Sequence, residues 1–427
     1  MVAQNPLPQS PRSPICAPIH FLVILNEQEQ LIADSIALKA DVLLEDLILH
    51  VGTPTGGFNE TGIEHTRNLL TSRLVALGAT HTQADPTPKP DWLPGGTPGG
   101  YKPTTSICQR LNDETTGRVL IAGHMDTVHD PEGPFQKLDI SDDGMTAIGP
   151  GCVDMKGGLV IAVAALEALE ECGIKANWTF VLNADEETGT YHSAEALAEQ
   201  AKLHDFGLAL EPAMPGGELV VERMGAGQFM IETFGKSAHV GRAFTEGISA
   251  VTKLAECIVA VGDMPDPDRG RILNIGPLQG GPVTNGVPDH ARAWGNCRFP
   301  DQTIADEIST MLEALNTSGD SLPGVKVHRS FNRPAKPLIP ATESLALQAR
   351  SVAEALGQKL PFAKTGGVCD GNILQQAGLP TIDTVGVRGG GLHTPDEWIE
   401  IPSLVERCQL LAILIARLTA GGSESHA

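Results

Sequence analysis

The sequence predicts an α/β fold, in which helices flank a mixed sheet, with a smaller α+β domain inserted into it. The chain has 427 residues, which is too long for a single hydrophobic core. Short apolar strands alternate with helices from residue 119 to 212 and again towards residue 418, as in sheets covered by helices on both faces. Near Gly227 the pattern changes to alternating, half-exposed strands, which are typical of antiparallel sheets. We therefore expect a discontinuous α/β domain with a second domain in its middle.

Residues 1–30 are interpreted as a loose N-terminal segment, because their apolar run is too short to span a membrane and follows Pro-rich sequence. Apolar residues spaced three and four apart predict helices over 32–50 and 61–77, the second ending at Gly78. The Pro- and Gly-rich stretch over 85–103 predicts a long surface loop.

The first part of the α/β domain is expected over residues 31–225, where strand and helix alternate after the loop. Short apolar runs predict buried strands at "VLIAG", "TFVLNA" and "FGLALEP". Helices are predicted from Gly158 onward and over 193–202. The second part of this domain is expected over 335–427.

The inserted domain is expected over residues 226–334, as a split β-α-β (ferredoxin-like) sandwich of four strands and two helices. The predicted strands are "QFMIETFG", "RILNIGPLQGG", "ARAWGNCRFP" and "VKVHRSF", and the helices lie over 247–261 and 302–315. Its outer edge is expected to pair with a second copy of the chain, since a two-fold dimer is the commonest closed assembly. We therefore expect a homodimer.

The composition is acidic, with 30 basic and 52 acidic residues and a formal net charge of −22. This charge argues against nucleic acid and anionic membranes as partners. None of the eight cysteines forms a CxxC pair, so we interpret them as reduced thiols, not as a disulfide framework or a thiolate zinc site. We expect a cytoplasmic protein that acts on a small molecule.

Acidic and histidine side chains gather where the predicted strands end. In an open α/β sheet, ligands bind beyond the carboxyl ends of the strands, so separate segments direct these groups to one crevice. Histidine and carboxylate ligands suit zinc or another borderline divalent metal, and their number favours two ions that share a ligand. Bound cations would also offset the repulsion among the adjacent carboxylates of "DEE". The candidate residues are His124, Asp126, Asp154, Glu186, Glu187, Glu211 and His393.

Six motifs carry a family resemblance: "GHMDTV", "GPGCVDMKGG", "NADEETG", "LEPAMPGG", "GKSAHVG" and "GLHTPDEW". Any one of them alone would more often be a capped turn or a solvated face, but here all six occur in order. Over roughly residues 115–415 the chain resembles the co-catalytic zinc metallopeptidases that include aminoacylase, acetylornithine deacetylase, succinyl-diaminopimelate desuccinylase and carboxypeptidase G. It is most similar to the glutamate carboxypeptidase branch, through "GPVTNGVPDHARAWGNCR", "NRPAKP" and "TGGVCDGN".

The resemblance implies a zinc-exopeptidase-like catalytic domain and a set of metal ligands. Asp154 would bridge two metals, His124 and Glu211 would complete one site, and Glu187 and His393 would complete the other. We expect two Zn²⁺ per subunit, with Co²⁺ or Mn²⁺ as alternatives.

The resemblance also implies a cis peptide bond between Asp154 and Met155. It assigns Asp126 to orient His124, and residues two apart on a strand do face the same side.

The remaining site residues act on the substrate. The resemblance makes Glu186 the general base and places His239 at the carbonyl oxygen, reaching the active site of the partner subunit. It assigns Asn285, Arg298 and Arg333 to the substrate carboxylate, although the two arginines could equally be ordinary ion-pair partners.

We therefore expect a di-zinc metallohydrolase of the carboxypeptidase type. It would cleave the amide of N-acyl amino acids or short peptides and release a C-terminal, acidic amino acid. One alternative is a deacylase of the acetylornithine or succinyl-diaminopimelate type. Another is a non-catalytic, metal-dependent binding module, which would have no use for the base Glu186.

Overall fold

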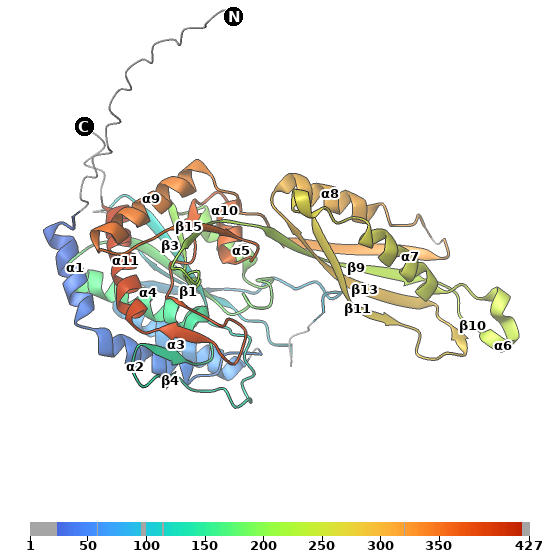
Figure 1. The fold of residues 1–427 in the computed structure, drawn as a ribbon, viewed down its shortest axis with the longest axis horizontal. Helices are drawn as coiled ribbons and strands as arrows, with labels where there is room; N and C mark the ends of the chain where they lie inside the picture. The colour runs from blue at the N-terminus through green and yellow to red at the C-terminus, as the bar shows by residue number, and fades with distance from the viewer. Residues whose placement is uncertain (1–23, 58, 95–99, 113–114, 320, 421–427) are drawn as a thin grey trace, which may run out of the picture.

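The computed structural model describes residues 24–57, 59–94, 100–112, 115–319 and 321–420. Figure 1 shows two lobes side by side, the larger containing both ends of the described chain and the smaller made from its middle. The larger lobe is a mixed sheet flanked by helices, and the smaller is an α+β sandwich, which confirms the predicted fold class. No helix of the described chain combines the length and the apolar character that crossing a membrane requires.

A mixed sheet forms the centre of the larger lobe. Its order in the described chain is β1 (Thr80–Ala84), β2 (Thr105–Arg110), β6 (Asn177–Asn183), β3 (Arg118–His124), β7 (Phe206–Ala209) and β16 (Thr381–Ile382). The four strands from β6 to β16 are parallel, while β1 and β2 are antiparallel to their neighbours. Every residue of β6 is buried, because helices cover both faces there.

The two faces of the sheet have separate apolar cores. Val119 and Ile121 of β3 pack into the core on one face, and Leu120 and Ala122 pack into the core on the other. This alternation follows from the two-residue period of a strand. The first face is covered by α4 (Gly157–Glu171) and α11 (Pro402–Thr419), and the second by α5 (Ala194–Ala201) and α10 (Asp370–Gln376).

The N-terminal helices differ from the sequence prediction. Two helices, α1 (Glu27–Ala37) and α2 (Ala40–Val51), replace the single helix expected over 32–50. The first begins inside the segment expected to be loose, because the Asn26 side chain and the Glu29 side chain cap each other's backbone N–H groups. The rest of that segment, residues 1–23, lies outside the described residues.

Two further helices complete the larger lobe. The first, α3 (Glu60–Ala76), lies within one residue of its predicted bounds. Gly78 follows it with a φ of +88°, a left-handed conformation that glycine adopts without steric cost. The second, α9 (Pro340–Ala355), begins with a proline, as the first turn of a helix allows.

The smaller lobe is an antiparallel sheet with two helices packed on one face. In chain order its elements are β9 (Gly225–Phe234), α7 (Ala250–Gly262), β11 (Ile272–Gly280), β13 (His290–Phe299), α8 (Gln302–Glu313) and β14 (Gly324–Arg333). The sheet order is β11-β13-β9-β14, the arrangement of a split β-α-β sandwich. At the far end of this lobe, β10 (Ala238–His239) and α6 (Val240–Ala243) project with β12 (Gly286–Val287) (Figure 1).

The two chain connections between the lobes lie side by side. The chain enters the smaller lobe after β8 (Leu219–Arg223) and returns at Lys336. The backbone N–H of Arg223 donates to the carbonyl oxygen of Lys336 at 2.9 Å, and the reciprocal bond is 3.0 Å long. Both side chains also pair with Asp383 of the larger lobe, at 2.8 Å and 3.0 Å. Each lobe has its own apolar core, so these paired connections join two separately packed bodies.

Candidate metal centre

Five of the predicted ligands meet at one edge of the central sheet. His124 is the last residue of β3, and Glu187 and Glu211 follow β6 and β7. These three strands are parallel neighbours, so their carboxyl ends open at the same edge. Asp154 lies in the turn before α4, and His393 lies in the loop between β17 (Gly389–Gly390) and β18 (Trp398–Glu400).

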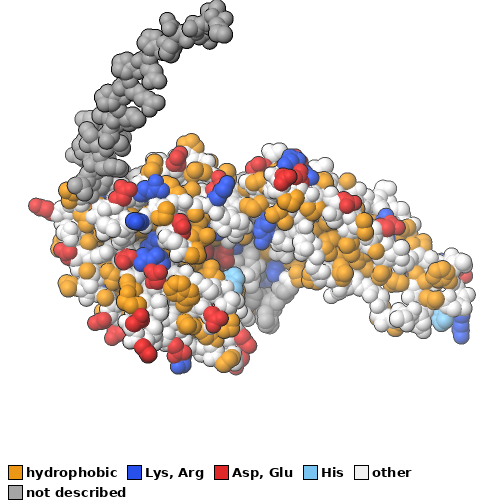
Figure 2. All heavy atoms as spheres, in the orientation of Figure 1, with side chains coloured by type: hydrophobic (Ala, Val, Ile, Leu, Met, Phe, Trp, Pro, Cys, Tyr) orange, Lys and Arg blue, Asp and Glu red, His pale blue; other side chains and the backbone are white. Residues whose placement is uncertain are grey.

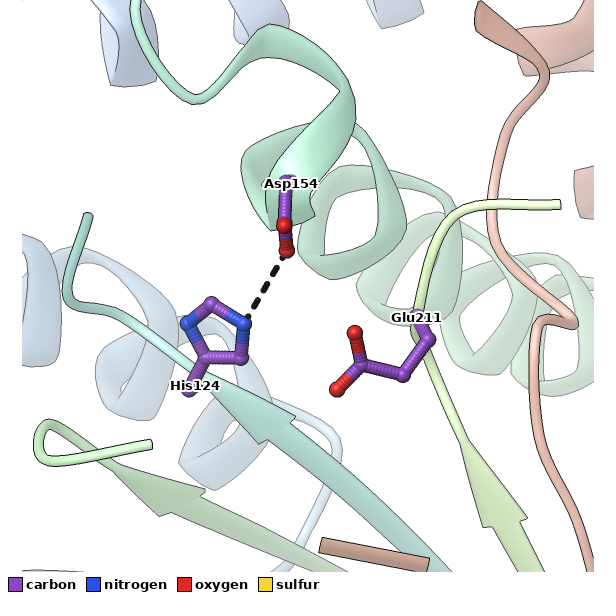
Figure 3. Close-up of side chains that lie close together, drawn as sticks. All are labelled: His124, Asp154 and Glu211. Carbon is purple, nitrogen blue, oxygen red and sulfur yellow. Dashed lines mark hydrogen bonds and ion pairs between the residues drawn. The ribbon is translucent and has the colours of Figure 1, made fainter. Parts of the chain in front are cut away.

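The five side chains form two groups that share Asp154. One group is His124, Asp154 and Glu211, and the other is Asp154, Glu187 and His393. Within each group the potential ligand atoms lie within 4.8 Å of one another. Asp154 turns Oδ1 to His124 Nε2 at 3.2 Å and Oδ2 to His393 Nε2 at 3.5 Å, so each oxygen serves one group. Figure 3 shows His124, Asp154 and Glu211 converging on one point from three separate elements.

The charges at this site favour a bound cation. Burial, together with the charges of Asp154 and Glu186, raises the pKa of Glu211 well above its usual value. The Oε1 atom of Glu211 is buried and has no hydrogen-bond partner among the described residues. Burial opposes protonation of His124, yet its neighbours Asp126 and Asp154 raise its pKa well above the usual value. Divalent metal ions would neutralise these carboxylates, and the nitrogen and oxygen donors suit zinc, cobalt or manganese.

Asp126 lies behind the ligands. The Nδ1 atom of His124 is 2.9 Å from the backbone carbonyl oxygen of Asp126 and 3.5 Å from its Oδ1, which leaves Nε2 facing Asp154. The Oδ2 atom of Asp126 accepts a hydrogen bond of 3.0 Å from the backbone N–H of Glu187. Asp126 therefore ties one ligand of each group together. The neighbouring Asp154–Met155 peptide bond is cis, as the resemblance implies.

Glu186 is held by an arginine from the smaller lobe. The Nη2 atom of Arg333 donates to Glu186 Oε1 at 2.7 Å and to its carbonyl oxygen at 3.0 Å. Arg333 Nη1 is 3.2 Å from Oδ1 of Asp370. Burial raises the pKa of Glu186 to about 7, against the opposing charge of Arg333. A carboxylate with this pKa can both take up and release a proton near neutral pH.

A cavity of about 460 Å³ extends from the site to the smaller lobe. Arg298 and Arg333 line it on the smaller lobe, and Glu187 and His393 line it on the larger lobe. Figure 2 shows this hollow between the lobes, with acidic and histidine side chains on one wall and Lys and Arg side chains on the other. Arg298 is half-buried and forms no ion pair within the described chain; its Nη1 donates to Asn296 Oδ1 and to the Cys297 carbonyl oxygen.

His239 and Asn285 lie away from this cavity. Both are exposed on the projection at the far end of the smaller lobe (Figure 1). His239 pairs with Gly286 across β10 and β12, and the carbonyl oxygen of Asn285 accepts from the N–H of Val240 at 3.0 Å. The structure therefore brings together the five ligands, Glu186 and the two arginines, but not these two residues.

Sequence reasoning missed several residues around the site. Lys89 belongs to the predicted surface loop, yet this loop reaches the cavity, and Gln228 and Asn296 line it from the smaller lobe. No motif marks Lys89 or Gln228, and the quoted motif "GPVTNGVPDHARAWGNCR" contains Asn296 without revealing what it faces. Asp370 and Glu397 lie inside the quoted motifs "TGGVCDGN" and "GLHTPDEW", which was the available signal, but a motif does not reveal a partner.

Comparison with known protein families identifies the family to which the chain is similar. Residues 120–417 match the profile of peptidase family M20/M25/M40. Carboxypeptidase G2 of Pseudomonas sp. (strain RS-16) is 28% identical over 378 residues, which cover 87% of this chain and 88% of that protein. Succinyl-diaminopimelate desuccinylase 2 of Shewanella loihica is 25% identical over 334 residues, covering 71% of this chain and 86% of that protein.

Solved structures share the fold. A tripeptidase from Staphylococcus aureus superposes with a TM-score of 0.69, covering 88% of this chain and 99% of that chain. Its sequence is 24% identical to this one, so this likeness concerns the fold alone.

Proposed function

The chain belongs to peptidase family M20/M25/M40 and is a metal-dependent peptidase or amidohydrolase of that family, and from this premise we propose a carboxypeptidase that releases an acidic amino acid. Its substrates would be N-acyl amino acids or short peptides. The observation that carries the proposal is the cavity itself. Its one wall holds candidate metal ligands, and its other wall holds Arg298, which forms no ion pair within the described chain. A scissile amide at the first wall would place a terminal carboxylate at the second.

The metal would be held by the two groups that share Asp154. His124 and Glu211 would complete one site, and Glu187 and His393 would complete the other. When bound, two divalent ions supply Lewis acidity and lower the pKa of a coordinated water. The native ions are proposed to be zinc.

Glu186 is proposed as the proton carrier. Its carboxylate lines the same cavity as Glu187 and His393, and Arg333 fixes its orientation. It would accept a proton from the attacking water and deliver it to the nitrogen of the leaving amino acid. A pKa of about 7 suits both transfers.

His239 and Asn285 are proposed to act in a partner subunit. Both are exposed at the tip of the smaller lobe and lie outside the cavity of their own chain. A two-fold dimer formed through the smaller lobe would carry this tip to the neighbouring site. There His239 would stabilise the oxygen that becomes negative as the amide carbon is attacked.

A second candidate function is deacylation of a succinylated amine. The desuccinylase relative supports it, and the cationic wall would accept a succinyl carboxylate as readily as an acidic side chain. The two functions differ in where the charge of the substrate lies relative to the scissile bond.

The test is a product-release assay on metal-free enzyme and on enzyme reconstituted with zinc. The panel contains N-acyl glutamates, N-acyl alanines with the same acyl groups, N-acetylornithine and N-succinyl-diaminopimelate. We expect turnover only with metal and the highest kcat/KM for N-acyl glutamates. Preference for the succinylated amine would favour the second function, and binding of metal without turnover of any substrate would contradict both.

A further inference from the structure

The carboxylate of Glu397 binds the turn that carries Asp154. We call residues 149–156 the Asp154 turn. The Oε1 atom of Glu397 accepts from the backbone N–H groups of Val153 and Asp154, each at 3.0 Å. Its Oε2 atom accepts from the N–H of Gly151 at 2.9 Å. Hydrogen bonds from several N–H groups to one ionised carboxylate are strong, and they fix the path of this turn.

Further contacts join the same two segments. The carbonyl oxygen of Glu397 accepts from the N–H of Gly149 at 3.0 Å, and the Sγ of Cys152 lies 3.6 Å from it. Nε2 of His129 is 2.6 Å from Glu397 Oε2, so this oxygen receives a side chain as well as a backbone donor. Gly151 has a φ of +68°, a left-handed conformation that lets successive N–H groups converge on one anion.

Glu397 belongs to the segment that carries another candidate ligand, His393. We call residues 391–397 the His393 loop; it joins β17 to β18, which pairs in turn with β5 (Thr146–Ile148) just before the Asp154 turn. His393 is 54% exposed at the tip of this loop. Its position therefore depends on how the ends of the loop are held. Glu397 is 1% exposed and binds the Asp154 turn directly.

We propose that Glu397 is a positioning residue that holds the Asp154 turn and the His393 loop together, so that both ligands meet the metal pair. The inference rests on the metal site of the proposed function. A carboxylate suits this position because each hydrogen-bond donor that contacts it among the described residues is an N–H group of the backbone or of His129. A glutamine would turn its own NH₂ group towards one of these donors and leave that donor unpaired.

The test measures binding of Zn²⁺ to the metal-free protein by calorimetry and by competition with a chelator. We expect Glu397→Gln to weaken Zn²⁺ binding by about 10–100-fold, the usual effect of removing a group that orients a ligand. Asp396→Asn is the matched control, because this neighbouring carboxylate is exposed. It should bind Zn²⁺ like the wild type. Excess Zn²⁺ should restore kcat of the Glu397→Gln variant with substrate KM unchanged, which general structural damage would not allow.

Two milder variants serve if Glu397→Gln does not fold. Glu397→Asp keeps the charge but shortens the reach, and His129→Phe removes one donor while keeping a ring and leaving the three backbone contacts. Zn²⁺ affinity should fall in both, and more in the first. Wild-type affinity in any folded Glu397 variant, or activity that does not recover when Zn²⁺ is bound, would overturn the inference. If the wild type itself binds no Zn²⁺, the proposed metal site fails first and the inference falls with it.

Discussion

The two arginines of the cavity differ in what their guanidinium groups contact. Arg333 is buried, and its two terminal nitrogens are engaged by Glu186 and Asp370. Arg298 is half-buried, and within the described chain it contacts only neutral oxygens. Burial lowers the pKa of Arg298, so an arriving carboxylate would find a poorly solvated charge to bind. We therefore propose that Arg298 recognises the acidic group, and that Arg333 orients Glu186 instead of binding the substrate carboxylate as the resemblance implies.

Substitution of each arginine should separate these roles. Arg298→Gln should raise KM by about 10–100-fold for glutamate-terminated substrates, the value of one charge-assisted hydrogen bond, and far less for alanine-terminated ones. Arg333→Gln should lower kcat for both substrate types and cost about 3–5 kcal/mol of stability, because it removes the cationic partner of the two buried carboxylates Glu186 and Asp370. Steady-state kinetics and denaturant unfolding measure these effects. Equal losses on the two substrates for Arg298→Gln would contradict the assignment.

The adjacent carboxylates of Glu186 and Glu187 also differ in what they contact. Glu187 lies 3.2 Å from His393 Nε2 in a ligand group, while Glu186 faces Arg333. Glu186→Gln should reduce kcat by about 10²–10⁴-fold with metal content near that of the wild type, because it removes the proposed base and no candidate ligand. Glu187→Gln should lower metal content. Elemental analysis of both dialysed variants measures this, and loss of metal in Glu186→Gln would reverse the two roles.

At the scale of the element, α2 contains a histidine that cannot easily be charged. His50 is 1% exposed, and burial lowers its pKa to about 4, despite Asp46 nearby. In the unfolded chain its pKa is about 6.5, so below that pH the unfolded state binds the proton more readily. The folded state therefore loses stability as pH falls from about 6.5 towards 4.

Replacing His50 should reduce the loss of folding stability that occurs at acidic pH. Between pH 7.5 and pH 5 the His50→Gln variant should lose about 1–2 kcal/mol less stability than the wild type. Urea unfolding of both metal-free proteins measures this. Parallel curves for His50→Gln and the wild type would show that His50 does not titrate differently on folding.

The sequence predicts the elements well where a strong local pattern exists. The apolar runs of β3, β6 and β7 and the helix α4 lie close to their expected bounds, because burial favours mostly apolar residues there. The break between α1 and α2 was missed, because apolar residues continue at helical spacing on both sides of Leu38 and Lys39 and both helices contribute to the same core.

The candidate site likewise combines residues that the sequence predicts with contacts that it does not predict. His124, Glu187 and Glu211 could be grouped from sequence because parallel strands end at a common edge. The contacts of Arg333 with Glu186 and of Glu397 with the Asp154 turn could not be predicted, because each joins segments more than 140 residues apart through folding alone.

At the scale of the whole molecule, the separation of His239 from the metal ligands makes a prediction about assembly. Glu186→Ala and His239→Ala should each be inactive. Mixed after reversible dissociation, they should recover roughly a quarter of wild-type activity, because half the dimers would be mixed and each would hold one intact site. Analytical ultracentrifugation and activity after exchange measure this. Proven exchange of subunits without recovery would show that His239 serves its own chain or has no catalytic part.

The paired connections at Arg223 and Lys336 have a consequence for the evolution of such a chain. Because the entry and the exit of the smaller lobe are hydrogen-bonded to each other, the larger lobe needs only a tight turn to close the gap if that lobe is absent. A short closure has a small entropic cost, and the two apolar cores share no residue. A single genetic insertion or deletion at this point can therefore add, remove or exchange the smaller lobe while the candidate metal ligands of the larger lobe are inherited intact.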